Sequence, residues 1–122
     1  MKTVIAVAGA VVIALMVGVA SFAQDATKKA YMLVQVDVTN PAQYGEYMKI
    51  SPGLIEKFGG RFIVRGGQSK TLEGAPATGR IVVVEFPTFE RAQQFYDSSE
   101  YQAAKKVRAG AANAQFILVE GI

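Results

Sequence analysis

The chain has 122 residues, a formal net charge of +3, 51% hydrophobic residues and 19% charged residues, which is the composition of one globular domain. It contains no cysteine and no histidine. This excludes disulfide bonds, thiolate chemistry, and every mechanism that needs an imidazole as a base or as a ligand of zinc or haem. The small and dispersed positive charge gives no electrostatic footprint for nucleic acid, so we expect no nucleic-acid partner. Because the chain lacks cysteine and histidine, we also expect no metal and no cofactor.

The N-terminal segment has the pattern of a secretory signal peptide. Lys2 is followed by the uncharged apolar run 4–19. The small residues Ser21 and Ala23 then stand at the spacing of a cleavage site before Gln24. The pattern therefore predicts export of a mature chain that begins at Gln24.

This reading divides the chain into a signal peptide at 1–23, a short linker at 24–30 and a single domain at 31–122. It places the mature protein in the bacterial periplasm or outside the cell, with no membrane contact after cleavage. The alternative is an uncleaved anchor in the inner membrane, because residues 4–23 are about long enough to span a bilayer.

A strand and a helix are predicted first. The alternating, β-branched stretch 31–38 predicts the first strand. Asn40 as a cap and Pro41 as the first helical residue predict the start of a helix that ends at the glycine pair 59–60. Pro52 removes a backbone N–H and clashes with the preceding turn, so we expect a kink there or a helix in two pieces.

Five further segments follow in chain order. They are a strand at 61–66, a glycine-rich loop at 67–79, an apolar and therefore central strand at 80–86, a helix that begins at 87, and a strand at 115–120. The helix is expected to break at 97–99 and to continue over 100–109. Its last turn contains Lys105, Lys106 and Arg108, which we expect to form a solvated basic end. The order β-α-β-β-α-β predicts an α+β, ferredoxin-like fold with a four-stranded antiparallel sheet and both helices on one face. Nothing in the sequence covers the other face. We expect a second copy of the chain to do so, giving a homodimeric α/β barrel.

Four stretches of the chain resemble the domain-of-unknown-function family 1330, a branch of the dimeric α/β-barrel superfamily. They are "DVTNPAQYGEY", "GGRFIVRGG", "VVVEFPTFERAQQFYDSSEYQAAKKVR" and "FILVEG", and the resemblance covers residues 30–122. It implies the fold and the dimer and no established activity. Relatives elsewhere in the superfamily include small oxygenases, haem enzymes that use chlorite or peroxide, and muconolactone-type isomerases. The haem enzymes need a histidine ligand that this chain lacks.

Alternation along the predicted strands divides their side chains between two faces. One set is wholly apolar and is expected under the helices: Val34, Val36, Phe62, Val64, Val82, Val84, Phe86, Phe116 and Leu118. The opposite set is mixed and is expected inside the dimer: Tyr31, Leu33, Gln35, Asp37, Arg61, Ile63, Arg65, Ile81, Val83, Glu85, Gln115, Ile117 and Val119.

The candidate ligand site lies at one end of that mixed face. With strand order 4-1-3-2, Gln115, Asp37, Ile81 and Arg65 line up, and Arg65 is expected to reach across two strand spacings of about 4.8 Å to Asp37. A guanidinium in a partly closed barrel is costly unless Asp37, the partner subunit or an anionic ligand matches it. The candidate ligand-binding residues are Gln35, Asp37, Arg65, Gly66, Gly67 and Gln115.

Arg61 and Glu85 are expected side by side at the other end of the sheet, where they would form a structural ion pair across neighbouring strands. Tyrosines on the helices, Tyr44 and Tyr47 among them, are expected as core or rim residues. One of their hydroxyls could donate to a substrate oxygen near the mouth of the barrel.

Three functions stay open. The first is an exported homodimer that binds a small anionic or aromatic molecule between its two sheets. The second is a cofactor-independent enzyme of the oxygenase or isomerase kind, in which Arg65 fixes the substrate and Asp37 or Glu85 moves a proton. The third is a purely structural dimer. A carboxylate base needs a raised pKa, whereas both carboxylates are expected beside arginines that lower it, and this favours binding.

Overall fold

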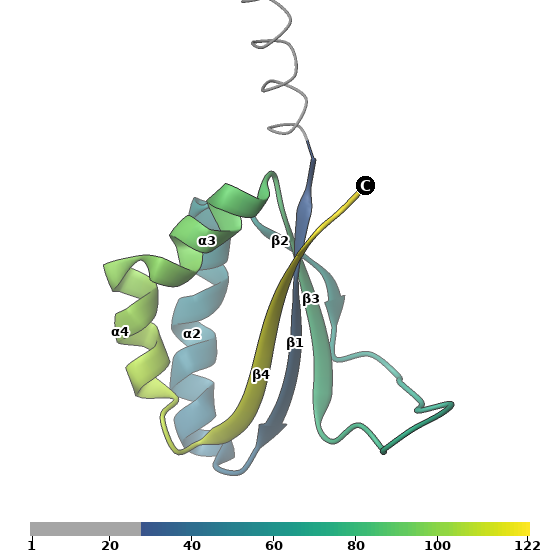
Figure 1. Ribbon diagram of the computed structural model, residues 1–122. Helices are drawn as coiled ribbons and strands as arrows, with labels where there is room; N and C mark the ends of the chain where they lie inside the picture. Colours follow the sequence, from purple (N-terminus) through teal and green to yellow (C-terminus); the bar gives the residue numbers. More distant parts are fainter. Residues whose placement is uncertain (1–27) are drawn as a thin grey trace, which may run out of the picture.

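The computed structural model describes residues 28–122 and contains seven helices and strands (Figure 1). In chain order they are β1 (Ala30–Val38), α2 (Pro41–Lys57), β2 (Arg61–Arg65), β3 (Arg80–Phe86), α3 (Phe89–Asp97), α4 (Ser99–Val107) and β4 (Ala112–Glu120). The predicted signal peptide lies outside the described residues. None of the helices within residues 28–122 has the length and apolar composition needed to cross a membrane.

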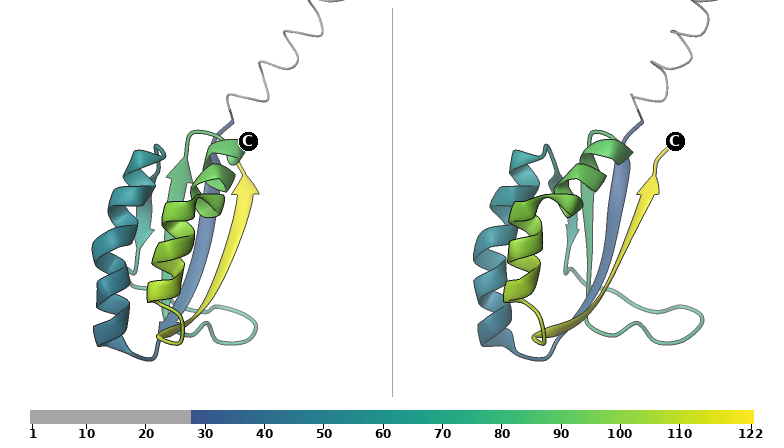
Figure 2. Two further views of the ribbon diagram at one scale, coloured as in Figure 1. Left: turned by 90° about the vertical axis from the view of Figure 1, so that its left-hand side faces the viewer. Right: turned by 60° about the vertical axis from the view of Figure 1, so that its left-hand side comes forward.

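The four strands form one antiparallel sheet in the order β2-β3-β1-β4. All three helices lie against the same face of that sheet, and the loop between β2 and β3 extends from the opposite side (Figures 1 and 2). The predicted ferredoxin-like fold is confirmed, with the second helix divided into α3 and α4.

Local side-chain caps set the limits of the helices. The Asn40 side chain accepts a hydrogen bond from the Gln43 amide at 3.2 Å and starts α2. Ser98 has extended backbone between α3 and α4, and its Oγ accepts from the Tyr101 amide at 3.1 Å and donates to the Phe95 carbonyl at 2.7 Å. The break predicted at this point is therefore confirmed.

The first helix runs without interruption through Pro52, so the predicted division into two pieces is wrong. Proline deletes the hydrogen bond to the Met48 carbonyl, and this loss alone does not end a helix whose packing continues on both sides. Tyr47, Ser51 and Ile55 are all buried around the proline. Tertiary packing therefore outweighs the local preference of the sequence.

The hydrophobic core lies between the helices and the sheet. Its largest fully buried side chains are Tyr101, Phe86, Phe95 and Val36. The Phe95 ring lies 4.6 Å from the Tyr101 ring and 5.3 Å from the Phe86 ring, measured between centroids, so the core includes aromatic contacts between α3, α4 and β3.

A β-bulge in β2 changes which face its last residues occupy. Phe62 pairs with Val84 as regular alternation requires, but the register then shifts, so that Val64 pairs with Val83 and Arg65 with Val82. One extra residue on β2 reverses the faces that follow it. Val64 therefore lies on the open face and Arg65 on the helix face, and the sequence-based assignment of both residues is wrong.

The open face of the sheet is apolar in its middle. Five large side chains there are 39–47% exposed within residues 28–122: Leu33, Ile63, Val64, Ile117 and Val119. They come from β1, β2 and β4 and form a continuous apolar surface opposite the helices, which we call the open apolar face.

Candidate functional site

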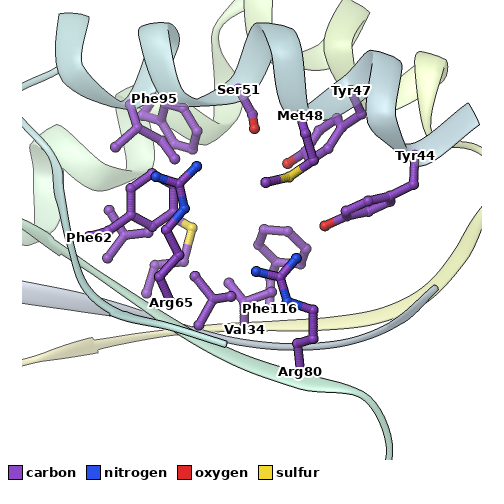
Figure 3. Close-up of a pocket in the computed structure, with 14 residues that line it drawn as sticks. Val34, Tyr44, Tyr47, Met48, Ser51, Phe62, Arg65, Arg80, Phe95 and Phe116 are labelled. Atoms are coloured by element: carbon purple, nitrogen blue, oxygen red, sulfur yellow. The ribbon is translucent and has the colours of Figure 1, made fainter. Parts of the chain in front are cut away.

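A cavity of about 40 Å³ lies between α2 and the sheet (Figure 3). This volume holds about three water-sized groups. Helix α2 supplies three polar side chains to its lining, Tyr44, Tyr47 and Ser51, and the sheet supplies two arginines, Arg65 and Arg80. The other lining residues are apolar: Met32, Val34, Met48, Ile55, Phe62, Val82, Val84, Phe95 and Phe116.

The two arginines face the cavity from neighbouring strands (Figure 3). Arg65 is the last residue of β2, and its guanidinium lies 4.1 Å from the centre of the Phe62 ring, a cation–π contact. Arg65 is exposed, so the cavity opens to solvent beside it, and Arg80, the first residue of β3, is half-buried. The β-bulge is the feature that brings Arg65 to this side of the sheet.

Neither cavity arginine has an acidic partner among residues 28–122. The ion pairs of that part of the chain join other residues: Lys28–Glu120, Lys29–Glu85, Lys49–Glu46, Lys57–Glu100 and Arg61–Glu85. No carboxylate lines the cavity. The rim of the cavity therefore carries two positive charges that the described protein does not neutralise.

Gly66 provides the space that the Arg80 side chain occupies. A Cβ atom at residue 66 would lie 2.6 Å from the Arg80 Nε and 2.8 Å from its Nη2, and the glycine has a φ of +69°, which other residues rarely adopt. Gly67 has open space around it and does not line the cavity. Of this glycine pair, only Gly66 contributes to the site.

The structure separates Arg65 from the other residues of the predicted site. Gln35, Asp37 and Gln115 line a different, polar hollow on the open face, where the Gln35 Nε2 donates to the Thr78 carbonyl at 3.2 Å. Gln115 pairs with Gln35 rather than lying beside Asp37. The predicted contact between Arg65 and Asp37 is wrong, because the bulge turns Arg65 to the opposite face.

The ion pair expected at the other end of the sheet is present. Arg61 pairs in register with Glu85, and its Nε donates to the Glu85 Oε1 at 2.9 Å. The Lys29 Nζ contacts the same oxygen at 3.3 Å. The hydrogen bond from Arg61 lowers the pKa of the Glu85 carboxyl below its usual value, so this carboxylate is a poor base at neutral pH.

A buried hydroxyl pair adjoins the cavity behind Tyr47. The Tyr47 and Tyr101 hydroxyl oxygens are 2.8 Å apart, and the Arg108 Nη2 donates to the Tyr101 hydroxyl at 3.4 Å. The Arg108 guanidinium also lies 5.3 Å from the Tyr47 ring and 4.9 Å from the Phe116 ring. Burial, reinforced by the neighbouring Tyr101, raises the pKa of the Tyr47 hydroxyl, so this hydroxyl stays protonated.

Sequence reasoning missed two residues of this region, Arg80 and Arg108. The sequence predicts Arg108 in a solvated helix end, but its side chain folds back over two aromatic rings. For Arg80 the sequence predicts only that it begins a strand. Its spacing of two residues from Val82, an apolar residue of the helix face, is the signal that could have placed it on that face.

The carboxylates within residues 28–122 do not gather in any group of three that could hold a metal ion. In this part of the chain, the polar chemistry of the cavity comes from guanidinium and hydroxyl groups. These groups bind oxygen acceptors, and the arginines act as donors only.

The sheet order and the helices on one face define a protein of the ferredoxin-like α+β class. The chain belongs to the domain of unknown function family DUF1330, whose sequence profile matches residues 29–122. A comparison with curated proteins gives no match.

Solved structures with this fold include three informative neighbours. A protein of unknown function from Rhodopseudomonas palustris is 22% identical, with a TM-score of 0.61, over 84% of this chain and 92% of that one. SnoaB, a cofactor-independent oxygenase from Streptomyces nogalater, is 8% identical, with a TM-score of 0.57, over 78% of this chain and 94% of that one. A dimeric protein of unknown function with a ferredoxin-like fold, from Bacteroides fragilis, is 12% identical, with a TM-score of 0.53, over 76% and 96% of the two chains. At these identities the similarity establishes the fold.

Proposed function

We propose that the protein is an exported homodimer in which each subunit binds a small anionic molecule in the cavity between α2 and the sheet. The observation that carries the proposal is the pair of arginines at the rim, Arg65 and Arg80, which have no acidic partner among residues 28–122. Arg80 is half-buried, and a guanidinium that is partly removed from water is unfavourable unless an anion matches it. Arg65 is exposed and adds a second positive charge at the rim. An anionic ligand supplies that match, and the apolar lining accepts its uncharged part.

The proposed ligand site is the cavity within one subunit, whereas the sequence predicts a site between the sheets of two subunits. Arg65 stays a ligand-binding residue, and Gly66 acts by giving Arg80 its place. Gln35, Asp37 and Gln115 lie on the other side of the sheet and have no part in this site.

The homodimer is supported by the open apolar face. Leaving several large apolar side chains on one surface in water is unfavourable, and a second copy would remove them from it. A structural neighbour with this fold is described as dimeric, which agrees with the same arrangement. Export is supported by the sequence pattern of residues 1–23 alone.

The composition of the cavity favours binding over acid–base catalysis. An isomerase, or an oxygenase like the SnoaB neighbour, would need a group to move a proton. The two candidates for that role, Asp37 and Glu85, do not line the cavity, and burial raises the pKa of the Tyr44 hydroxyl although Arg108 and Arg80 oppose this. A tyrosine of that kind donates a hydrogen bond and does not accept a proton at neutral pH.

Calorimetric titration of the purified protein with small carboxylates and with inorganic phosphate tests the proposal. Arg65→Gln is expected to weaken binding at least about tenfold, because it removes a charge-assisted hydrogen bond. Lys70→Gln is the matched control, because it removes the same charge from the exposed loop that follows β2. Equal losses in both variants, or no binding of any anion by the parent protein, would contradict the proposal.

A further inference from the structure

The proposed anion site has a charge and a lining that narrow the class of ligand. Resting on that proposed function, we propose that the ligand is a short-chain dicarboxylate whose two acid groups are bound by Arg65 and Arg80. Its carbon skeleton then occupies the apolar cavity beneath them.

The charge of the rim calls for two negative charges. The Arg80 side chain passes directly over Gly66, the residue that follows Arg65, and both arginines reach the cavity from the sheet side (Figure 3). Each guanidinium carries one positive charge. A monoanion would neutralise one of them and leave the other without a partner, whereas a dianion neutralises both.

The apolar lining of the cavity favours a hydrocarbon chain between the two acid groups of the ligand. The floor of the cavity is made of aliphatic and aromatic side chains, with Val34, Val82 and Phe116 on the strands. Such a surface stabilises methylene groups and gives nothing to a polar spacer. The volume of about 40 Å³ matches a skeleton of about two to four carbon atoms.

Two hydroxyl groups complete the site from the opposite side. The Tyr44 and Ser51 side chains point from α2 toward the cavity, facing the arginines (Figure 3). A hydroxyl can donate to the second oxygen of a carboxylate that an arginine binds. The site thus offers donors on two sides and an apolar surface between them. Inorganic phosphate uses the donors but leaves the apolar surface uncovered.

The test compares three probes by calorimetric titration of the purified protein: succinate, its monoamide succinamate, and inorganic phosphate. Succinamate has nearly the same shape as succinate and one charge fewer, so the pair isolates the second acid group. We expect succinate to bind at least about tenfold more tightly than succinamate and more tightly than phosphate. In Arg80→Gln the two organic acids should bind with nearly equal affinity, whereas Lys70→Gln should keep the preference for succinate.

The possible results distinguish a failure of the dicarboxylate proposal from a failure of the proposed anion site. Equal affinities of the parent protein for succinate and succinamate, or phosphate binding as tightly as succinate, would overturn the dicarboxylate and leave an anion site. Failure of all three probes to bind would overturn both. Should Arg80→Gln not fold, Arg65→Gln gives the same comparison, because Arg65 is exposed and its substitution removes only the cation–π contact with the Phe62 ring.

Discussion

Arg80 lies directly over Gly66, so that residue 66 has room for a hydrogen atom and none for a methyl group. The two residues stand at opposite ends of the loop 66–79, and the Gly66 amide donates to the Ile81 carbonyl at 2.9 Å. The loop is thus closed at its base by a backbone hydrogen bond and by the arginine that crosses the glycine. The contact between Arg80 and Gly66 therefore lies both at the rim of the cavity and at the base of this loop.

Gly66→Ala should weaken ligand binding and lower stability together. The new methyl group would displace the Arg80 guanidinium from the cavity rim, and the positive φ of residue 66 would cost about 1–2 kcal/mol in the free energy of unfolding. Titration with succinate and urea denaturation measure the two effects. Gly67→Ala is the control, because a Cβ at residue 67 meets open space. If the Gly66→Ala protein binds succinate as tightly as the parent protein does, Arg80 is not part of the binding site.

Tyr101→Phe should destabilise the protein by about 1–3 kcal/mol. The substitution leaves the buried Tyr47 hydroxyl without its partner at 2.8 Å, and an unsatisfied buried polar group carries a cost of that size. Tyr47→Phe should cost less, because the Tyr101 hydroxyl still accepts a hydrogen bond from the Arg108 Nη2 at 3.4 Å. The double variant should cost less than the sum of the two, because it removes both hydroxyls at once. Strictly additive values in urea denaturation would show that the hydroxyls do not interact.

The ion pair between Arg61 and Glu85 should stabilise the protein near neutral pH and lose its effect in acid. The folded-state pKa of Glu85 is lowered, chiefly by the hydrogen bond from Arg61, so its contribution is fully present above the unfolded pKa near 4.5 and is lost as the pH falls through the lower folded-state pKa. The melting temperature of the parent protein should exceed that of Arg61→Gln at pH 7, and the two should converge once the pH is below the folded-state pKa of Glu85. Ligand binding should be unchanged, because Arg61 does not line the cavity.

Ile117→Glu should convert the proposed dimer into a folded monomer. The substitution places a charge in the middle of the open apolar face, where the Ile117 side chain is 47% exposed in a single subunit and loses no core packing. Sedimentation analysis gives the mass, and far-ultraviolet circular dichroism reports the fold. Gln93→Glu, an equal change of charge on the exposed side of α3, should leave the assembly unaltered. A parent protein that sediments as a monomer at high concentration would contradict the dimer itself.

The sequence predicts the fold well because its signals are local and agree with one another. Asn40 with Pro41 marks the start of α2, and Ser98 marks the break between α3 and α4. Alternation identifies the helix face of β1 and β3 correctly, because those strands pair without irregularity. In these regions each residue's own preference and the final structure coincide.

The site was harder to predict because it depends on a bulge. The alternation of Phe62, Ile63, Val64 and Arg65 gives no sign of the extra residue, since Ile63 and Val64 are both apolar and fit either face. The Arg61–Glu85 pair lies before the bulge and matches its prediction, whereas Arg65 lies after it and does not. The position of the Arg108 guanidinium over the Tyr47 ring likewise depends on tertiary packing that no local sequence pattern encodes.

The extra residue of β2 lets that strand tolerate one change in the length of the gene. Removing Ile63 would restore strict pleating and leave Val64 opposite Val83 and Arg65 opposite Val82, so both side chains would keep their present faces. One lost codon would therefore shorten the open apolar face by one side chain and leave the Arg65 guanidinium at the cavity. A few codons gained or lost within 67–77, whose residues are exposed, would disturb neither surface.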